Sequence, residues 1–249
     1  MLLELIVGTV TLRPYVFGFL GLFLAAGSAD LGWRRTILFG SVVWPIAWLA
    51  EFSSTRTGIP FGLYHYTGAT RGQELYIANV PFMDALSFTF LAYASFSLAR
   101  AMLAGRNPSR AARALLAGTL MLALDVVIDP LAVRGDRWFL GRIFYYPAGG
   151  VYFGVPLSNF VGWLLVGALG VAAYLAVAGG VTAGRLWPGV ALYYVVLVFN
   201  LAVTAWIGEW TLLAVGVALH VVIAATILYL RGAAAGATPA LPSEGVQQA

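Results

Sequence analysis

Residues 114–133 read ALLAGTLMLALDVVIDPLAV, an apolar run of membrane-spanning length that two acids interrupt. A helix of about 20 residues crosses the hydrocarbon core of a bilayer, but an ionised carboxylate at that depth is costly. Asp125 and Asp129 are four residues apart, so on a helix they share one face and differ in depth by about 6 Å. The stretch therefore predicts a membrane helix whose acidic face is turned away from lipid.

The whole chain has the composition of a membrane protein. Of its 249 residues, 61% are hydrophobic and 10% are charged, whereas soluble domains carry about 25% charged residues. We expect an all-α bundle of about seven transmembrane helices, over residues 14–29, 37–52, 80–104, 111–131, 155–178, 186–207 and 210–230. Residues 1–12 are too short to span and predict an interfacial helix. The predicted domain covers residues 1–231, and the polar, Pro-containing segment 232–249 predicts a disordered tail.

The arginines predict an orientation in the membrane. All 14 basic residues are Arg. When the spans alternate in direction, more of these arginines fall on the side of the C-terminus than on the side of the N-terminus. The positive-inside rule then places the N-terminus outside and the C-terminus inside the cell membrane. The sequence contains no basic run typical of nucleic-acid binding, so we expect membrane lipid and no nucleic acid around the protein.

Polar residues within the apolar spans gather at one end of the expected bundle. Alternating the span directions places there Glu51, Asp84, Asp125, Asp129, Asn159, Asn200 and Glu209. The same end carries two long loops, residues 53–79 and 132–154, which are rich in aromatic residues. The loops predict either an interfacial aromatic belt or a lid over a cavity.

Several of these polar residues also have a purely structural interpretation. Glu51 could pair with Arg56, Asp84 could be a favourable anion near a helix N-terminus, and Asn159 could join two helices by a hydrogen bond. Asp129 precedes Pro130 and could mark a helix end. These alternatives stay open at the level of the sequence.

Asp125 is the strongest candidate for chemistry. It lies too deep to cap a helix, and no basic residue lies within a helical turn of it. Burial disfavours the charged form of a carboxyl group, and a second carboxyl nearby adds to that effect. A carboxylic acid kept protonated in this way is a candidate general acid.

The residue inventory excludes several classes of membrane protein. The chain has no Lys for a retinal Schiff base, no Cys for thiolate ligands, and only two His for a di-iron site. A prenyltransferase needs two Asp-rich motifs and here DVVID supplies one, so that interpretation is weak. We therefore expect proton chemistry on a lipophilic substrate without a cofactor or metal, in which an acid protonates an alkene and aromatic or carboxylate groups stabilise the cation.

Three stretches together carry a family resemblance: GIPFGLYHYTG (58–68), ALDVVIDPLAV (123–133) and GGVYFGVPLSNFVGWLLVG (149–167). The region from Glu51 to Gly167 resembles the carotenoid biosynthesis family of membrane carotenoid 1',2'-hydratases. Two features depart from the pattern that we expect of the family. The run RGDRWFL has few aromatic residues, and Asp84 is an additional acid.

The resemblance implies that water adds across the terminal double bond of an acyclic (ψ) carotenoid end group. In this hypothesis Asp125 protonates the alkene, Glu51 or Asp129 stabilises the cation and activates water, and Asn159 orients the water or a carboxylate. The substrate-binding residues that shield the cation are Tyr64, Tyr66, Tyr152 and Trp163. Lycopene or γ-carotene is the expected type of substrate, and other carotenoid-pathway enzymes are expected partners. The alternatives are a carotenoid cyclase or isomerase that shares the protonation step, and a non-catalytic carotenoid-binding protein.

Overall fold

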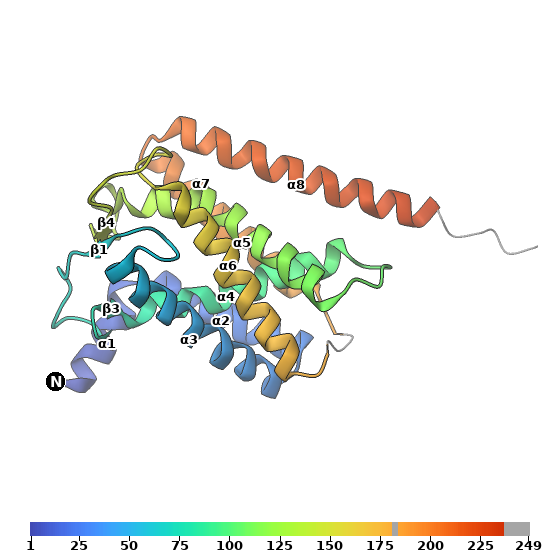
Figure 1. Ribbon diagram of the computed structural model, residues 1–249, viewed down its shortest axis with the longest axis horizontal. Helices are drawn as coiled ribbons and strands as arrows, with labels where there is room; N and C mark the ends of the chain where they lie inside the picture. Colours follow the sequence, from blue (N-terminus) through green and yellow to red (C-terminus); the bar gives the residue numbers. More distant parts are fainter. Residues whose placement is uncertain (181–183, 237–249) are drawn as a thin grey trace, which may run out of the picture.

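Helices make up most of the computed structural model, which describes residues 1–180 and 184–236. In chain order the elements are α1 (Leu2–Leu12), α2 (Pro14–Asp30), α3 (Trp33–Thr57), β1 (His65–Tyr66), β2 (Tyr76–Ile77), β3 (Val80–Pro81), α4 (Phe82–Met102), α5 (Arg110–Ala132), a 3-10 turn η1 (Gly135–Arg137), β4 (Phe144–Tyr145), α6 (Leu157–Val177), α7 (Trp187–Trp206) and α8 (Trp210–Gly236). The helices lie side by side as a bundle, and the short strands gather at one end of it (Figure 1).

The all-α polytopic fold predicted from the sequence is confirmed. Within the described residues, six helices (α3 to α8) are long and apolar enough to cross a membrane, and α1 with α2 make a seventh span if that bent pair counts as one. Alone, α2 has 17 residues, fewer than the roughly 20 that a span needs. The two helices meet at 86°. Pro14 explains the break, because proline suits the first turn of a new helix.

The C-terminal helix α8 lies at the periphery of the bundle. Only 17% of its most apolar window is buried, against 78% for α4, and it runs along one side of the molecule (Figure 1). It continues to Gly236, so the helix ends later than the boundary predicted at residue 231. The remainder of the predicted disordered tail, residues 237–249, lies outside the described residues.

Helix α4 is the centre of the bundle. It packs against α2, α3, α5, α6 and α7. Its stretch LAYASFSLA (91–99) alternates small with large residues, and small residues let membrane helices approach closely. Between them, the ring of Phe96 packs against Phe39 of α3 and Tyr174 of α6, with centroids 6.2 Å away in each case.

Helices α5 and α6 approach each other at two glycines. A Cβ atom added at Gly118 would lie 2.4 Å from the Leu164 carbonyl oxygen and 2.8 Å from the Ala168 nitrogen. A Cβ atom at Gly167 would lie 3.1 Å from the Gly118 Cα. The two backbones are therefore in contact, and this contact sets the spacing of the helices that carry Asp125, Asp129 and Asn159.

The two long loops pair with each other over one end of the bundle. Strand β1 of the first loop runs antiparallel to β4 of the second, with His65 opposite Tyr145 and Tyr66 opposite Phe144. The Thr67 hydroxyl adds a 2.8 Å hydrogen bond to the Arg142 carbonyl oxygen. We call this paired structure, residues 58–79 and 133–156, the cap.

The glycine contact between α5 and α6 predicts a stability effect. We expect Gly118→Ala to destabilise the protein by about 1–3 kcal/mol, because the added methyl group overlaps the α6 backbone. Unfolding of the purified protein in detergent, followed by circular dichroism, measures the change. Gly21→Ala in α2 is the matched control, since its Cβ meets nothing within 4 Å. Equal stability of the two variants would contradict the close packing.

Candidate active site: an acid-lined cavity under the cap

A cavity of about 130 Å³ lies between the helices and the cap. Helices α2 to α7 all contribute to its wall, and the cap contributes Phe61, Tyr64, Tyr66, Trp138, Leu140, Ile143, Phe144 and Tyr146. Most of these side chains are apolar or aromatic, and the polar ones are few. This composition is typical of a site for an apolar ligand with a small number of groups that act on it.

Three carboxyl groups from three helices face this cavity. Glu51 comes from the last turns of α3, Asp84 from the first turn of α4, and Asp129 from the last turn of α5. Glu51 is buried, and the other two are partly buried. Within the described residues, no group of three or more His, Asp or Glu side chains is placed to hold a metal ion. The arrangement is a set of separate acids around an apolar space.

Asp125 lies behind the cavity wall, fully buried, and anchors a hydrogen-bond network. Its Oδ2 accepts a 2.7 Å hydrogen bond from Asn159 Nδ2 of α6, and its Oδ1 accepts one of 3.2 Å from the Asp129 backbone N–H. The Tyr146 hydroxyl donates to Asn159 Oδ1 at 3.0 Å. The network therefore joins α5, α6 and the cap, and its outer members Asn159 and Tyr146 reach the cavity.

Pro130 lies inside α5, and its missing N–H has a structural consequence. A proline cannot donate to the carbonyl four residues earlier, here that of Val126. The Tyr152 hydroxyl donates to that carbonyl at 3.2 Å instead. Tyr152, which lies outside the cavity, thus supplies the hydrogen bond that the Val126 carbonyl lacks within α5. Helix α5 continues to Ala132, so Asp129 does not end the helix. The Asp129 side chain faces the cavity.

Two tyrosines of the first loop stand over the acids. Their hydroxyl groups are 3.4 Å apart, and Tyr66 lies close enough to Glu51 and Asp84 to interact with both. Burial, together with the nearby carboxyl groups, raises the pKa of Tyr64 and of Tyr66 well above the ordinary value. Both hydroxyls therefore remain protonated, and they can donate to the carboxyl groups or pass a proton between them.

An aromatic wall faces the acids. The indole of Trp163 stacks on Phe88, with ring centroids 4.7 Å apart, and Phe88 packs against Phe61 at 5.8 Å. The same indole donates a 3.2 Å hydrogen bond from Nε1 to Asp129 Oδ2. Trp163 therefore orients a carboxyl group with its edge and presents a π surface near it, which is the geometry that stabilises a cation.

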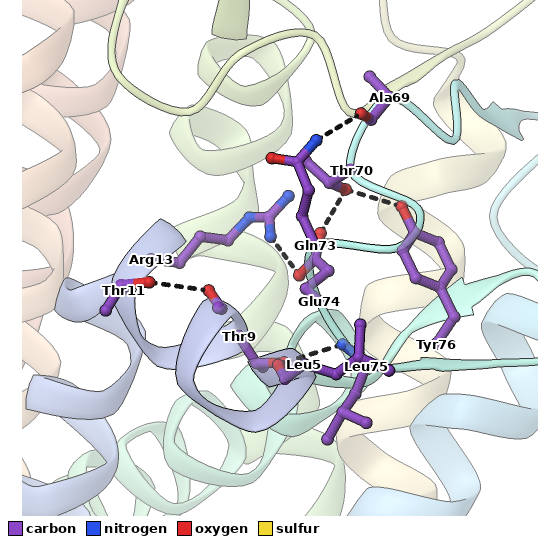
Figure 2. Close-up of polar contacts among 11 residues, drawn as sticks. Leu5, Thr9, Thr11, Arg13, Ala69, Thr70, Gln73, Glu74, Leu75 and Tyr76 are labelled. Carbon is purple, nitrogen blue, oxygen red and sulfur yellow. Dashed lines mark hydrogen bonds and ion pairs between the residues drawn. The ribbon is translucent and has the colours of Figure 1, made fainter. Parts of the chain in front are cut away.

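A buried ion pair ties the first loop to the bend between α1 and α2 (Figure 2). Arg13 pairs with Glu74, and both side chains are almost fully buried. Thr70 also donates to Glu74, and the backbone N–H of Leu75 donates to the Thr9 hydroxyl at 2.8 Å. Arg13 is close enough to Asp84 to act on it electrostatically. The ion pair thus fastens the cap and places a positive charge near one of the three acids.

Of the eight site residues predicted from the sequence, six line the cavity: Glu51, Tyr64, Tyr66, Asp129, Asn159 and Trp163. Asp125 touches the site only through its neighbours, and Tyr152 lies outside it. Glu51 does not pair with Arg56, which donates to the Phe52 carbonyl and to Asn79 instead.

Two further residues belong to the site. Asp84 was visible in the sequence as an acid at the correct end of the bundle, and in the structure it both lies in a first helical turn and faces the cavity. Tyr146 was one of many aromatic residues in the second loop, and no pattern distinguishes it from Tyr145, which is exposed.

Fold and cavity together indicate an integral membrane protein with an acid-lined, largely apolar cavity. The chain belongs to the family described as "Carotenoid biosynthesis protein", whose model matches residues 3–225, and the predicted family is confirmed. Bisanhydrobacterioruberin hydratase of Haloarcula japonica is 31% identical over 151 residues, which cover 61% of this chain and 48% of that relative. The match thus spans about half the length of the curated relative. No solved structure matches the chain.

The hydrogen bond between Asn159 and Asp125 predicts a coupling between α6 and α5. We expect Asn159→Leu to cost about 1–3 kcal/mol of stability, because it leaves the Asp125 carboxyl buried with an unpaired oxygen. The double variant Asp125→Leu/Asn159→Leu should lose less than the sum of the two single changes. Chemical unfolding in detergent measures all three variants, and strictly additive losses would contradict the coupling.

Proposed function

We propose that this protein hydrates the terminal double bond of an acyclic (ψ) carotenoid end group. The observation that carries the proposal is the cavity itself, in which three carboxyl groups from different helices surround an apolar space. Membership of the carotenoid biosynthesis family implies a carotenoid as substrate. The relative that is named a hydratase supports addition of water as the reaction.

Glu51 is the proposed proton donor. Among the described residues, none hydrogen-bonds to its buried Oε2 atom. Burying an unpaired negative charge is far costlier than burying a neutral acid, and Asp84 and Asp129 lie close enough to add repulsion. A neutral Glu51 carries an O–H that can protonate the less substituted alkene carbon. The alkene π electrons form the new C–H bond, and a tertiary cation remains on the neighbouring carbon.

Asp129 is the proposed base for the attacking water. Its Oδ2 accepts the Trp163 N–H, and this hydrogen bond offsets part of the cost of burying the charged form of the carboxyl group. Water adds to the cation through its oxygen, and its surplus proton passes to Asp129. The proton then returns to Glu51, for which the Tyr64 and Tyr66 hydroxyls offer a path. The sum of the steps is the addition of one water molecule.

Asp125 takes a positioning role in this scheme, in place of the acid role expected from the sequence. It contacts the backbone of Asp129 and the side chain of Asn159, and both of these reach the cavity. Trp163 and Phe88, with the tyrosines of the first loop, shield the cation until water arrives. Proton loss from the cation, which would yield an isomer, is thereby disfavoured.

The proposed location is the cell membrane, with the N-terminus outside and the C-terminus inside. The distribution of arginine residues supports this orientation. The two described ends of the chain lie at opposite ends of the bundle (Figure 1), as an odd number of crossings requires. Enzymes that make or consume the same carotenoid are proposed partners, because an insoluble substrate is best passed on within the membrane.

Product analysis tests the reaction. We expect co-expression with the genes for lycopene or γ-carotene synthesis to yield a pigment heavier by one water, because hydration adds a whole molecule. Growth in isotopically labelled water should place the label on the new hydroxyl oxygen. A product with the mass of the substrate would instead indicate a cyclase or isomerase. Unchanged pigment bound to the purified protein would indicate a binding protein.

Substitutions test the residue roles. We expect Glu51→Gln and Asp129→Asn each to lower the rate of hydration by about 10²–10⁴-fold, the usual contribution of a general acid or base. Asp125→Asn should lower it less, because its side chain does not reach the reacting atoms. Glu4→Gln changes an exposed acid outside the cavity and is the control. A loss at Asp125→Asn that exceeds the loss at Glu51→Gln would restore Asp125 as the donor.

A further inference from the structure

The cavity is too small for a whole carotenoid. Its volume of about 130 Å³ is close to that of an engineered cavity of about 150 Å³ that holds one benzene molecule. An acyclic end group fits such a space, but the long conjugated chain attached to it does not. If the proposed function is correct, the polyene must leave the cavity through one of its walls.

One wall is continuous with an aromatic surface. Tyr15 of α2 and Phe199 of α7 line the cavity and stack with centroids 5.1 Å apart. Both contact Phe139 of the cap, at 5.6 Å and 6.4 Å. Phe139 in turn lies 6.3 Å from Trp206 at the end of α7. We call these four residues the aromatic path.

The outer end of the aromatic path is open to the surroundings of the bundle. Phe139 is 53% exposed and Trp206 is 67% exposed, whereas Phe19, which packs against Phe199 at the inner end, is buried. The path therefore changes from exposed to buried over a few side chains. A molecule that moves between lipid and an enclosed site needs such a change from exposed to buried contacts.

The cap holds the outer residues in place. Arg137, two residues before Phe139, pairs with Glu209, and Arg134 pairs with the same carboxylate at 3.1 Å. Glu209 lies in the turn between α7 and α8, three residues after Trp206. These ion pairs fix the loop that carries Phe139 against the end of α7. The aromatic path is thus supported by charges that lie beside it.

We propose that the aromatic path, Tyr15, Phe139, Phe199 and Trp206, is the binding surface and lateral entrance for the conjugated chain of the substrate while its end group occupies the cavity. The inference rests on the proposed function for the identity of the ligand. Flat aromatic side chains suit a rigid polyene, because both present extended π faces and dispersion accumulates along them.

Thiol protection tests the path directly, because the chain contains no Cys. Phe139→Cys and Trp206→Cys each create a single thiol on the path. Leu157→Cys, at the start of α6, is the matched control: Leu157 is 62% exposed, apolar and at the same end of the bundle. Each variant is reconstituted in phosphatidylcholine vesicles, with or without lycopene, and labelled with an apolar maleimide.

The proposal expects lycopene to slow labelling of Phe139→Cys and Trp206→Cys by at least about fivefold and to leave Leu157→Cys unchanged. Product mass is measured on the same samples. Protection without a hydrated product supports the path and overturns the proposed reaction. A hydrated product without protection overturns the path and leaves the reaction standing. Neither protection nor product overturns both.

A kinetic measurement gives an independent reading. Phe139→Ala should raise KM for lycopene several-fold and leave kcat within about twofold, because the path binds the polyene and does not touch the reacting carbon. Leu157→Ala should change neither value. A fall in kcat at constant KM for Phe139→Ala would overturn the assignment, since it would place Phe139 in the chemistry.

Discussion

The hydrogen bond between Asn159 and Asp125 is the contact on which the rest of the site depends. It joins α5 and α6 near the cap, while Gly118 and Gly167 bring the two backbones into contact further along the helices. From this bond the network extends to Tyr146 in the cap, and through the helix to Asp129. A buried carboxyl oxygen that loses its hydrogen-bond partner costs free energy, so the partners of Asp125 cannot move independently.

Much of the fold follows from the sequence, because hydropathy alone identifies membrane helices. The gathering of Glu51, Asp129 and Asn159 at one end also follows, since alternating spans assign each helix end to a side. The sequence does not tell which way a helix face turns. Asp125 and Asp129 share a face by spacing, yet small differences in rotation place Asp129 at the cavity and Asp125 against α6. Depth in the membrane is therefore a poor guide to which acid faces the cavity.

Long-range pairs were beyond reach for a different reason. Arg13 and Glu74 are 61 residues apart and come from a helix bend and a loop, and no periodicity connects them. The sequence predicts that Tyr152 shields the cation in the cavity. Its hydroxyl instead donates to the Val126 carbonyl, which Pro130 leaves without a backbone donor. In both cases a buried polar group found a partner that only the assembled structure brings near. The need to pair a backbone carbonyl in one case and a buried charge in the other thus determines where these side chains lie.

The two loops of the cap are joined through the backbones of β1 and β4. The pairing of the loops therefore does not depend on the side chains that line the cavity. The strands pair regardless of which side chains they carry toward the cavity. Ile143 and Phe144, which line the cavity with apolar side chains, can then be exchanged for other apolar residues while the cap keeps its backbone structure. We expect relatives that accept different end groups to diverge at these positions first. The cap is in this sense the part of the protein in which new substrate preferences can evolve at little risk to folding.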